Sequence, residues 1–171
     1  GSLAPMKRDR LEEEFTDHVT QYKERYYRLA YSYVRNADDA LDIVQESIYK
    51  AFLSVGSLKD PHSMKTWFYR IVVNASLDFL RKRKRSYPVE DEVLTRLDSG
   101  EADRYEDFDL KNALDQLPEK YRIVIVLRFF EDLKIEEIAE VLDENANTIK
   151  TRLYTSLNRL RLTLRDNGTE V

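Results

Sequence analysis

The chain has 171 residues, of which 42% are hydrophobic and 35% charged, with a net charge of −4 and no cysteine. This composition allows one domain or two small ones with real cores, and it excludes disulfides, thiolate metal sites and a uniformly basic surface. No run of about 18 apolar residues occurs, so neither a transmembrane helix nor direct membrane insertion is expected.

Residues 1–5 precede Met6 and are typical of an expression scar, so they are left out of the predicted fold. Apolar residues then recur every three or four positions, which predicts a long amphipathic helix ending near Asn36. A second helix is expected to begin at Ala37, followed by acids suited to the positive end of its dipole. Its predicted buried positions are Leu41, Val44, Ile48, Ala51 and Phe52.

A loop and a third helix follow. Gly, Asp-Pro and Ser mark residues 56–63 as the loop, and an apolar side at helical spacing predicts a helix over residues 64–84. Residues 81–85 are five consecutive cations, and residues 87–109 then carry nine acids against two arginines. This charge pattern, with poor hydrophobic periodicity, predicts a flexible acidic linker.

Helical periodicity returns at Leu110, and Pro118 suits the first turn of the next helix. Residues 123–126 are β-branched and resemble a strand, but the flanking patterns favour a helix. Residues 135–142 repeat an apolar face, residues 143–145 break it, and the apolar face resumes at Ile149, Leu153 and Leu157. This layout is typical of a helix-turn-helix that enters the major groove of DNA.

The predicted fold is therefore all-α. An N-terminal helical bundle over residues 6–86 is joined by the linker, residues 87–109, to a four-helix domain over residues 110–166, with a tail over 167–171.

A second nucleic-acid signal lies before the linker. Asn74, Asp78 and Arg81 are spaced i, i+4 and i+7 and form a polar stripe that the basic run continues. Cations in such a stripe pair with phosphates, and an amide can read a base edge. The aromatic residues 67–69 either stack on unpaired bases or, as is commoner for such residues, belong to the core.

Four segments, in order, resemble the extracytoplasmic-function (ECF) group of bacterial RNA polymerase sigma factors, within the sigma-70 family. Residues 36–47 resemble the polymerase-binding helix, and residues 66–81 resemble the segment that melts and reads the minus-ten promoter element. Residues 117–122 resemble the opening of the second domain, and residues 135–160 resemble the helix-turn-helix that reads the minus-thirty-five element. One motif would be weak evidence, whereas four at the family's separations are specific.

The resemblance implies a factor that binds core RNA polymerase and directs promoter-specific initiation, and that is not an enzyme. It assigns polymerase binding to Asp39, Asp42, Gln45, Glu46 and Tyr49. It assigns minus-ten recognition to Trp67, Asn74, Asp78, Arg81 and Arg85. Asn74 is the candidate base or strand contact and the two arginines are candidate phosphate contacts, while Asp78 alternatively caps or orients a neighbouring cation. Residues 56–65 resemble the family element that holds a flipped base.

For the minus-thirty-five element, the resemblance assigns Thr148, Lys150, Thr151 and Arg152. Thr148 is a candidate phosphate contact or helix cap. The turn departs from the family pattern, because Asp143 replaces the usual glycine and Asn147 precedes Thr148. Both residue types tolerate left-handed backbone, whereas Glu144, where an apolar residue is common, is expected to loosen the turn. Because Thr155 and Leu157 stand where cations are frequent, this helix alone should bind DNA weakly.

The implied partners are core RNA polymerase, promoter DNA and an anti-sigma factor, and the implied location is the cytoplasm, with possible tethering to the membrane through that anti-sigma partner. The linker resembles the family segment that passes the RNA-exit region of the polymerase, where it is either a channel occupant or a solubilising tether.

Other classes of function find less support. His18 and His62 are the only histidines and lack ligand-like spacing, and no Gly-rich phosphate loop is present, so no metal, cofactor or catalytic residue is expected. The alternative function is a stand-alone helix-turn-helix regulator that binds operator DNA as a dimer.

Overall fold

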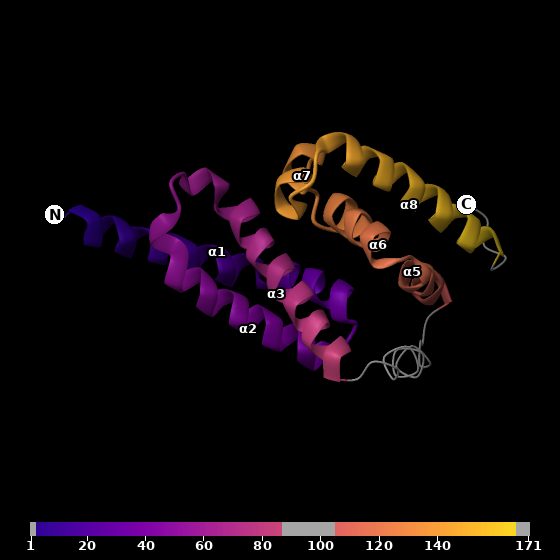
Figure 1. Ribbon diagram of the computed structural model, residues 1–171, viewed down its shortest axis with the longest axis horizontal. Coiled ribbons are helices and arrows are strands. Elements are labelled where there is room, and N and C mark those ends of the chain that lie inside the picture. The colour runs from indigo at the N-terminus through magenta and orange to yellow at the C-terminus, as the bar shows by residue number, and fades with distance from the viewer. Residues whose placement is uncertain (1–2, 87–104, 167–171) are drawn as a thin grey trace. The chain divides into compact units, whose positions relative to one another are not determined.

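The computed structural model describes residues 3–86 and 105–166, and every regular element in these ranges is a helix. The described residues divide into two units (Figure 1). The bulk of the first unit is formed by the N-terminal helices as far as Leu80, and the bulk of the second by the C-terminal helices. The predicted all-α fold with two helical domains is confirmed.

The first unit has three long helices: α1 (Leu3–Val34), α2 (Ala37–Ser54) and α3 (Met64–Ser86). α1 departs from helical geometry at Tyr22, with φ −114° and ψ 17°. Between α1 and α2, Arg35 has a left-handed φ of 52°. Asn36 then caps α2, because its Oδ1 accepts a hydrogen bond from the Asp39 N–H at 2.9 Å. The predicted start of the second helix at Ala37 is confirmed.

Aromatic rings form the centre of the first unit. The buried Phe15 of α1 contacts Phe52 of α2 and Phe68 of α3 edge to face, with ring centroids 5.1 and 4.9 Å apart. Tyr26, also buried, contacts Phe68 at 4.5 Å and Tyr69 at 4.7 Å. Such pairs contribute about 0.5–1.5 kcal/mol each beyond area burial, so this cluster holds the three helices together.

The predicted buried face of α2 is wrong at Leu41, which is 43% exposed. Ile43 and Ser47 are buried instead, and Ser47 satisfies its hydroxyl by donating to the Ile43 carbonyl at 2.7 Å. Ser47 can be buried because its hydroxyl is bonded within its own helix. A prediction that places only apolar residues in the core therefore misplaced the buried face of α2 by part of a turn. The predicted loop after α2 contains two short 3₁₀ turns, η1 (Val55–Ser57) and η2 (Pro61–Ser63).

The second unit has four α-helices: α5 (Tyr105–Gln116), α6 (Glu119–Ile125), α7 (Ile135–Leu142) and α8 (Ala146–Asp166). α5 begins inside the segment predicted as linker, whose residues 87–104 lie outside the described residues. The β-branched residues 123–126 are helical, as the flanking patterns indicated. They enter a π-helical turn, η3 (Val126–Phe130), which leaves Phe129 56% and Phe130 43% exposed.

The turn between α7 and α8 has one left-handed residue. Asp143 has a left-handed φ of 55°, as its residue type suggested, whereas Asn147 lies within α8 and needs no such tolerance.

On α8 the predicted buried face is wrong at Leu157, which is 43% exposed, while Ser156 is fully buried. The Ser156 hydroxyl lies 2.5 Å from the Arg152 carbonyl of its own helix and 3.0 Å from the Tyr121 carbonyl of α6, so a polar residue occupies this helix contact.

Candidate functional site

The exposed side of α2 carries the residues predicted to bind polymerase. Asp42, Gln45 and Glu46 are exposed, Tyr49 is 65% exposed, and Asp39 is half-buried with its N–H bonded to the cap. At about 100° per residue, all five predicted residues project within an arc of about 120°. We call this the α2 arc.

Two residues of the same side were missed. Leu41 and Leu53 are 43% and 62% exposed, and with Tyr49 they give this helix an apolar stripe beside its acids. Single exposed apolar side chains are ordinary, but several grouped on one side of a helix are a feature of protein interfaces. Leu41 and Leu53 are eight and four residues from Tyr49, and this helical spacing could have placed them on the same side as Tyr49.

α3 carries the predicted minus-ten residues on one straight face. Asn74, Arg81 and Arg85 are exposed, and Asp78 is half-buried. Trp67 is also half-buried, with its ring edge to face against Phe15 at 5.9 Å, so it is partly a core residue. Since α3 continues unbroken to Ser86, these positions all fall within about 60° of one another around the helix axis.

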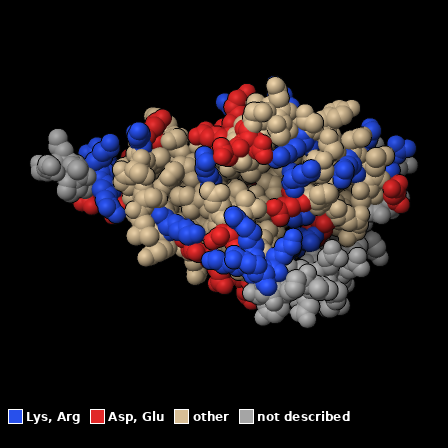
Figure 2. Space-filling view, in the orientation of Figure 1, with Lys and Arg blue, Asp and Glu red and all other residues tan. Residues whose placement is uncertain are grey.

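The basic run extends this face. Arg83, Lys84 and Arg85 occupy the last turn of α3, where cations are favoured by the helix dipole. Figure 2 shows Lys and Arg side chains gathered over the end of this helix. Arg70, on the same side of α3, is also exposed and was not predicted. A row of cations at the end of a polar stripe suits the phosphates of one nucleic-acid strand.

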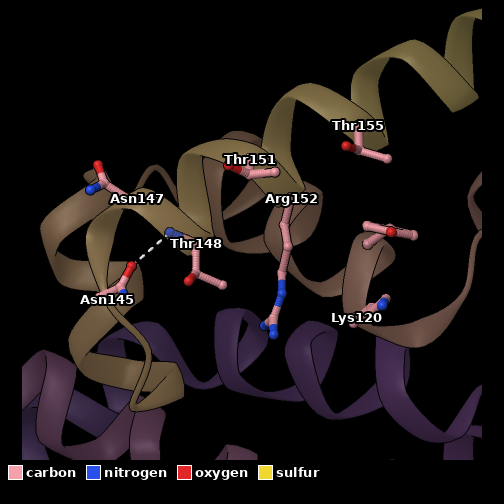
Figure 3. Close-up of a pocket in the computed structure, with 8 residues that line it drawn as sticks. Lys120, Asn145, Asn147, Thr148, Thr151, Arg152 and Thr155 are labelled. Carbon is pink, nitrogen blue, oxygen red and sulfur yellow. Dashed lines mark hydrogen bonds between the residues drawn. The ribbon is translucent and has the colours of Figure 1, made fainter.

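The start of α8 borders a hollow of about 440 Å³, whose other wall comes from the start of α6 (Figure 3). Of the predicted minus-thirty-five residues, Thr148, Thr151 and Arg152 line this hollow. Lys150 is exposed but does not line it. Thr148 is not the helix cap: Asn145 Oδ1 accepts a hydrogen bond from the Thr148 N–H at 2.8 Å. The structure thus brings three of the four residues together.

Arg152 already has a partner. Its Nη2 lies 3.1 Å from Glu144 Oε1, and the two side chains are 26% and 37% exposed. Glu144, which was expected to loosen the turn, therefore ties the turn to α8. Its own N–H also donates to the Ala139 carbonyl at 2.9 Å. The sequence could have indicated this ion pair, because Glu144 and Arg152 carry opposite charges and are eight residues apart.

Two further residues of the second unit were missed. Lys120 is exposed and lines the hollow from α6. Tyr154, on α8, is 76% exposed, which is high for an aromatic side chain. The position of Tyr154 one helical turn beyond Lys150 could have indicated that it lies on the same side of α8. Lys120 lies outside the helix-turn-helix, and no pattern in the sequence pointed to it.

Two titratable groups are perturbed. Burial raises the pKa of Glu119, the first residue of α6, and the charge of Arg122 partly offsets this effect. In the first unit, burial lowers the pKa of His18, and the charges of Lys65 and Arg25 lower it further. Neither shift marks a catalytic pair. Among the described residues, no group of three or more His, Asp or Glu side chains is placed to hold a metal ion, and no helix there could cross a membrane.

The two units match two family models in order. Residues 18–86 match Sigma-70 region 2, and residues 107–160 match Sigma-70, region 4. The chain is 54% identical over 146 residues to RNA polymerase sigma factor SigV of Bacillus subtilis (strain 168), covering 85% of this chain and 88% of that protein. It is 36% identical over 170 residues to ECF RNA polymerase sigma factor SigW of the same organism, covering 91% of each.

The fold has solved counterparts. The sigma factor RpoE of Bartonella quintana, in complex with the anti-sigma factor NepR, has a TM-score of 0.73 at 23% identity, covering 90% of this chain and 98% of that one. CnrH, in complex with the cytosolic domain of CnrY, has a TM-score of 0.69 at 21% identity, covering 96% of each. At these identities the likeness shows the fold alone. The curated relatives and both family models identify this chain as a member of the ECF group of RNA polymerase sigma factors, in the sigma-70 family.

Proposed function

We propose that this sigma factor divides promoter-specific initiation among the three surfaces described above. The α2 arc binds core RNA polymerase, with Tyr49 and its leucine neighbours as the apolar centre. The exposed face of α3 engages the opened minus-ten strand, with Asn74 as the base contact and the terminal cations on phosphates. The start of α8 reads the minus-thirty-five element through Thr151, Arg152 and their neighbours.

One observation carries this proposal. Trp67, Asn74, Asp78, Arg81 and Arg85 project from one face of one unbroken helix, although eighteen residues separate the first from the last. A core-packing requirement does not explain the polar members of this row, because the core of the first unit lies on another side of α3. A nucleic-acid strand, which presents phosphates and bases along a line, does explain it.

Reconstitution with core polymerase tests the function. The full chain and core polymerase, with a library of random promoter sequences, should yield transcripts from a defined subset that shares two spaced elements. A gel shift on the enriched promoter, with and without core polymerase, separates this function from the alternative. Duplex binding by the chain alone at moderate salt would favour a stand-alone regulator. The pairing of a region 2 segment with a region 4 segment does not favour that alternative.

We propose that the chain has no chemistry of its own and acts only through the polymerase. We also propose that it works in the cytoplasm, where core polymerase and promoter DNA are found. An anti-sigma factor is expected to hold it inactive, in line with the complexes of RpoE with NepR and of CnrH with CnrY. Hydrolytic or transfer activity in the absence of polymerase would contradict the first of these proposals.

A further inference from the structure

The hollow beside α8 has an unusual lining. Its walls include two cations, Lys120 and Arg152, and three threonines, Thr148, Thr151 and Thr155. Asparagine amides and the Tyr121 ring complete it, and it has no carboxylate or aliphatic side chain in its lining. The Glu144 carboxylate, which pairs with Arg152 at 3.1 Å, is not among the lining residues. Cations and hydroxyls suit an anion with several acceptor oxygens, and a phosphate diester is such a group.

The two walls are held in register. The fully buried Ser156 hydroxyl of α8 lies 3.0 Å from the Tyr121 carbonyl of α6 and 2.5 Å from the Arg152 carbonyl of its own helix, so it bridges the two helices. The Tyr121 ring also lies against two cations: the Lys120 ammonium is 5.1 Å from its centroid, and the Arg159 guanidinium is 4.6 Å away. Cation–π contacts of this kind place positive side chains beside an aromatic face. Lys120 is therefore placed by α6 next to the helix that enters the groove.

We propose that this hollow receives a backbone phosphate of the minus-thirty-five DNA, held between Lys120 of α6 and Arg152 of α8. Lys120 is then a DNA contact outside the recognition helix, and it contributes affinity without reading a base. Arg152 turns from Glu144 to the phosphate when DNA arrives. This inference rests on the proposed function, because the DNA is brought to the hollow by α8 within the polymerase complex.

The test uses holoenzyme assembled from core polymerase and the full chain on a promoter selected by the wild type. Lys120→Gln should weaken promoter binding about fivefold, which corresponds to about 1 kcal/mol for a partly exposed charge pair. In a plot of the logarithm of the binding constant against the logarithm of salt concentration, the slope should become less negative by about 0.9, the value for one phosphate contact. Lys134→Gln, which removes an exposed cation that does not line the hollow, should change neither quantity.

A second measurement identifies the phosphate. Neutral methylphosphonate linkages are placed one at a time through the minus-thirty-five element. One position, or two adjacent positions, should weaken wild-type binding but have no further effect on Lys120→Gln, because the same contact is already lost. If methylphosphonate at every position weakened binding by Lys120→Gln as much as binding by the wild type, the proposed role of the hollow would be wrong. A Lys120→Gln salt slope equal to that of the wild type would have the same meaning. Neither result would contradict the proposed function. A wild-type chain that confers no promoter binding would overturn the proposed function as well. A matched circular dichroism spectrum shows that the variant is folded.

Discussion

At the scale of single residues, the ion pair between Arg152 and Glu144 is the main departure from what the sequence indicated. A glutamate in the turn appeared unfavourable because an apolar residue is common there. The structure gives it a specific partner at 3.1 Å, and this partner is a predicted DNA contact. The pair neutralises a cation that the recognition helix, already poor in positive charge, would otherwise present to DNA.

Removing Glu144 should therefore strengthen DNA binding. We expect Glu144→Ala to raise the promoter affinity of the holoenzyme by up to about fivefold, since a partly exposed ion pair is worth about 0.2–1 kcal/mol. Glu140→Ala, on the exposed side of α7, is the matched control for the loss of one negative charge. Equal gains from both variants, measured by titration of labelled promoter, would show that only net charge matters.

His18 should make the first unit sensitive to acid. Its Nε2 is hydrogen-bonded to the hydroxyl of the buried Tyr26, and burial, with the charges of Lys65 and Arg25, lowers its pKa below 6.5. Above pH 6.5 both folded and unfolded states are neutral at this residue, so stability is fully present. As the pH falls from 6.5 toward the lower folded pKa, the unfolded state takes up the proton first and stability is lost.

The measurement is urea unfolding by circular dichroism from about pH 7.5 to about pH 5, with imidazole NMR to follow His18 directly. His18→Gln should flatten the decline in stability. His62→Gln removes the only other histidine, which is exposed in η2, and should leave the decline in place. A decline that persists unchanged in His18→Gln would assign it to carboxylates instead.

Exposure of individual residues was the least predictable property. Periodicity predicted α1 as an amphipathic helix, and its large apolar residues Phe15, Tyr26 and Leu29 are buried. It failed at Leu41 and Leu157, where a serine bonded to a nearby carbonyl occupies the tight helix contact instead. Hydrophobicity alone does not distinguish a leucine that stays exposed from one that is buried, so Leu41 and Leu157 were assigned to the core side.

At the scale of elements, two asparagines perform the same task on two functional helices. Asn36 Oδ1 accepts from the Asp39 N–H at 2.9 Å at the start of α2, and Asn145 Oδ1 accepts from the Thr148 N–H at 2.8 Å at the start of α8. Replacing either with Ala should cost about 1 kcal/mol of stability. The functional consequences should differ, because different surfaces begin at the two caps.

We expect Asn145→Ala to weaken minus-thirty-five recognition and leave core polymerase binding unchanged. Asn36→Ala should instead weaken core binding, because the frayed turn includes Asp39 of the α2 arc. Core binding by size-exclusion chromatography and promoter binding by gel shift, performed on both variants, separate the two effects. Identical profiles for the two variants would indicate a general loss of stability rather than a local one.

Ser156 should contribute more than other buried serines. Its hydroxyl contacts the Arg152 carbonyl of α8 at 2.5 Å and also reaches the Tyr121 carbonyl of α6 at 3.0 Å, whereas Ser47 bonds only within α2. Ser156→Ala should destabilise the second unit by about 1 kcal/mol, the usual contribution of a hydrogen bond between protein groups. Ser47→Ala should be near neutral, because its bond to its own helix adds little to helix stability. Urea unfolding measures both, and equal losses would argue against a special role for the contact between helices.

Element identity followed from the sequence where patterns were long. The acids at the start of α2 and the break at residues 143–145 gave correct boundaries, and the helical flanks of residues 123–126 outweighed their β-branched composition. The π-helical turn was beyond this kind of reasoning. At this turn Leu127 and Leu133 are fully buried while Phe129 and Phe130 are exposed, and local periodicity does not predict which of these apolar residues is buried.

At the scale of the whole molecule, charge divides the chain more clearly than hydrophobicity. The five cations end α3, and the acids follow at once. The change from basic to acidic residues predicted a linker between two units. One family model matches residues 18–86, before the acidic segment, and the other matches residues 107–160. The exact start of the second unit was not predictable, because α5 begins among acids that have no apolar period.

The acidic segment gives a prediction at this scale. If its charge lets it occupy the RNA-exit path, replacing the six acids between residues 87 and 104 with Asn or Gln should change the ratio of abortive to full-length transcripts. The chain length stays constant, so the tether is unaltered. Transcription with purified holoenzyme measures the ratio. A normal ratio, together with normal promoter binding, would leave the segment as a solubilising tether.

The position of Trp67 has a practical consequence. It is the only tryptophan of the chain, and it lies half-buried against Phe15 on the same face of α3 as Asn74. Its fluorescence will therefore respond to events on the face proposed to meet the separated strand, with no competing indole elsewhere in the factor. A hydroxylated tryptophan analogue incorporated there absorbs at longer wavelength than ordinary tryptophan. Stopped-flow excitation at that wavelength would time strand separation inside the assembled enzyme without an attached dye.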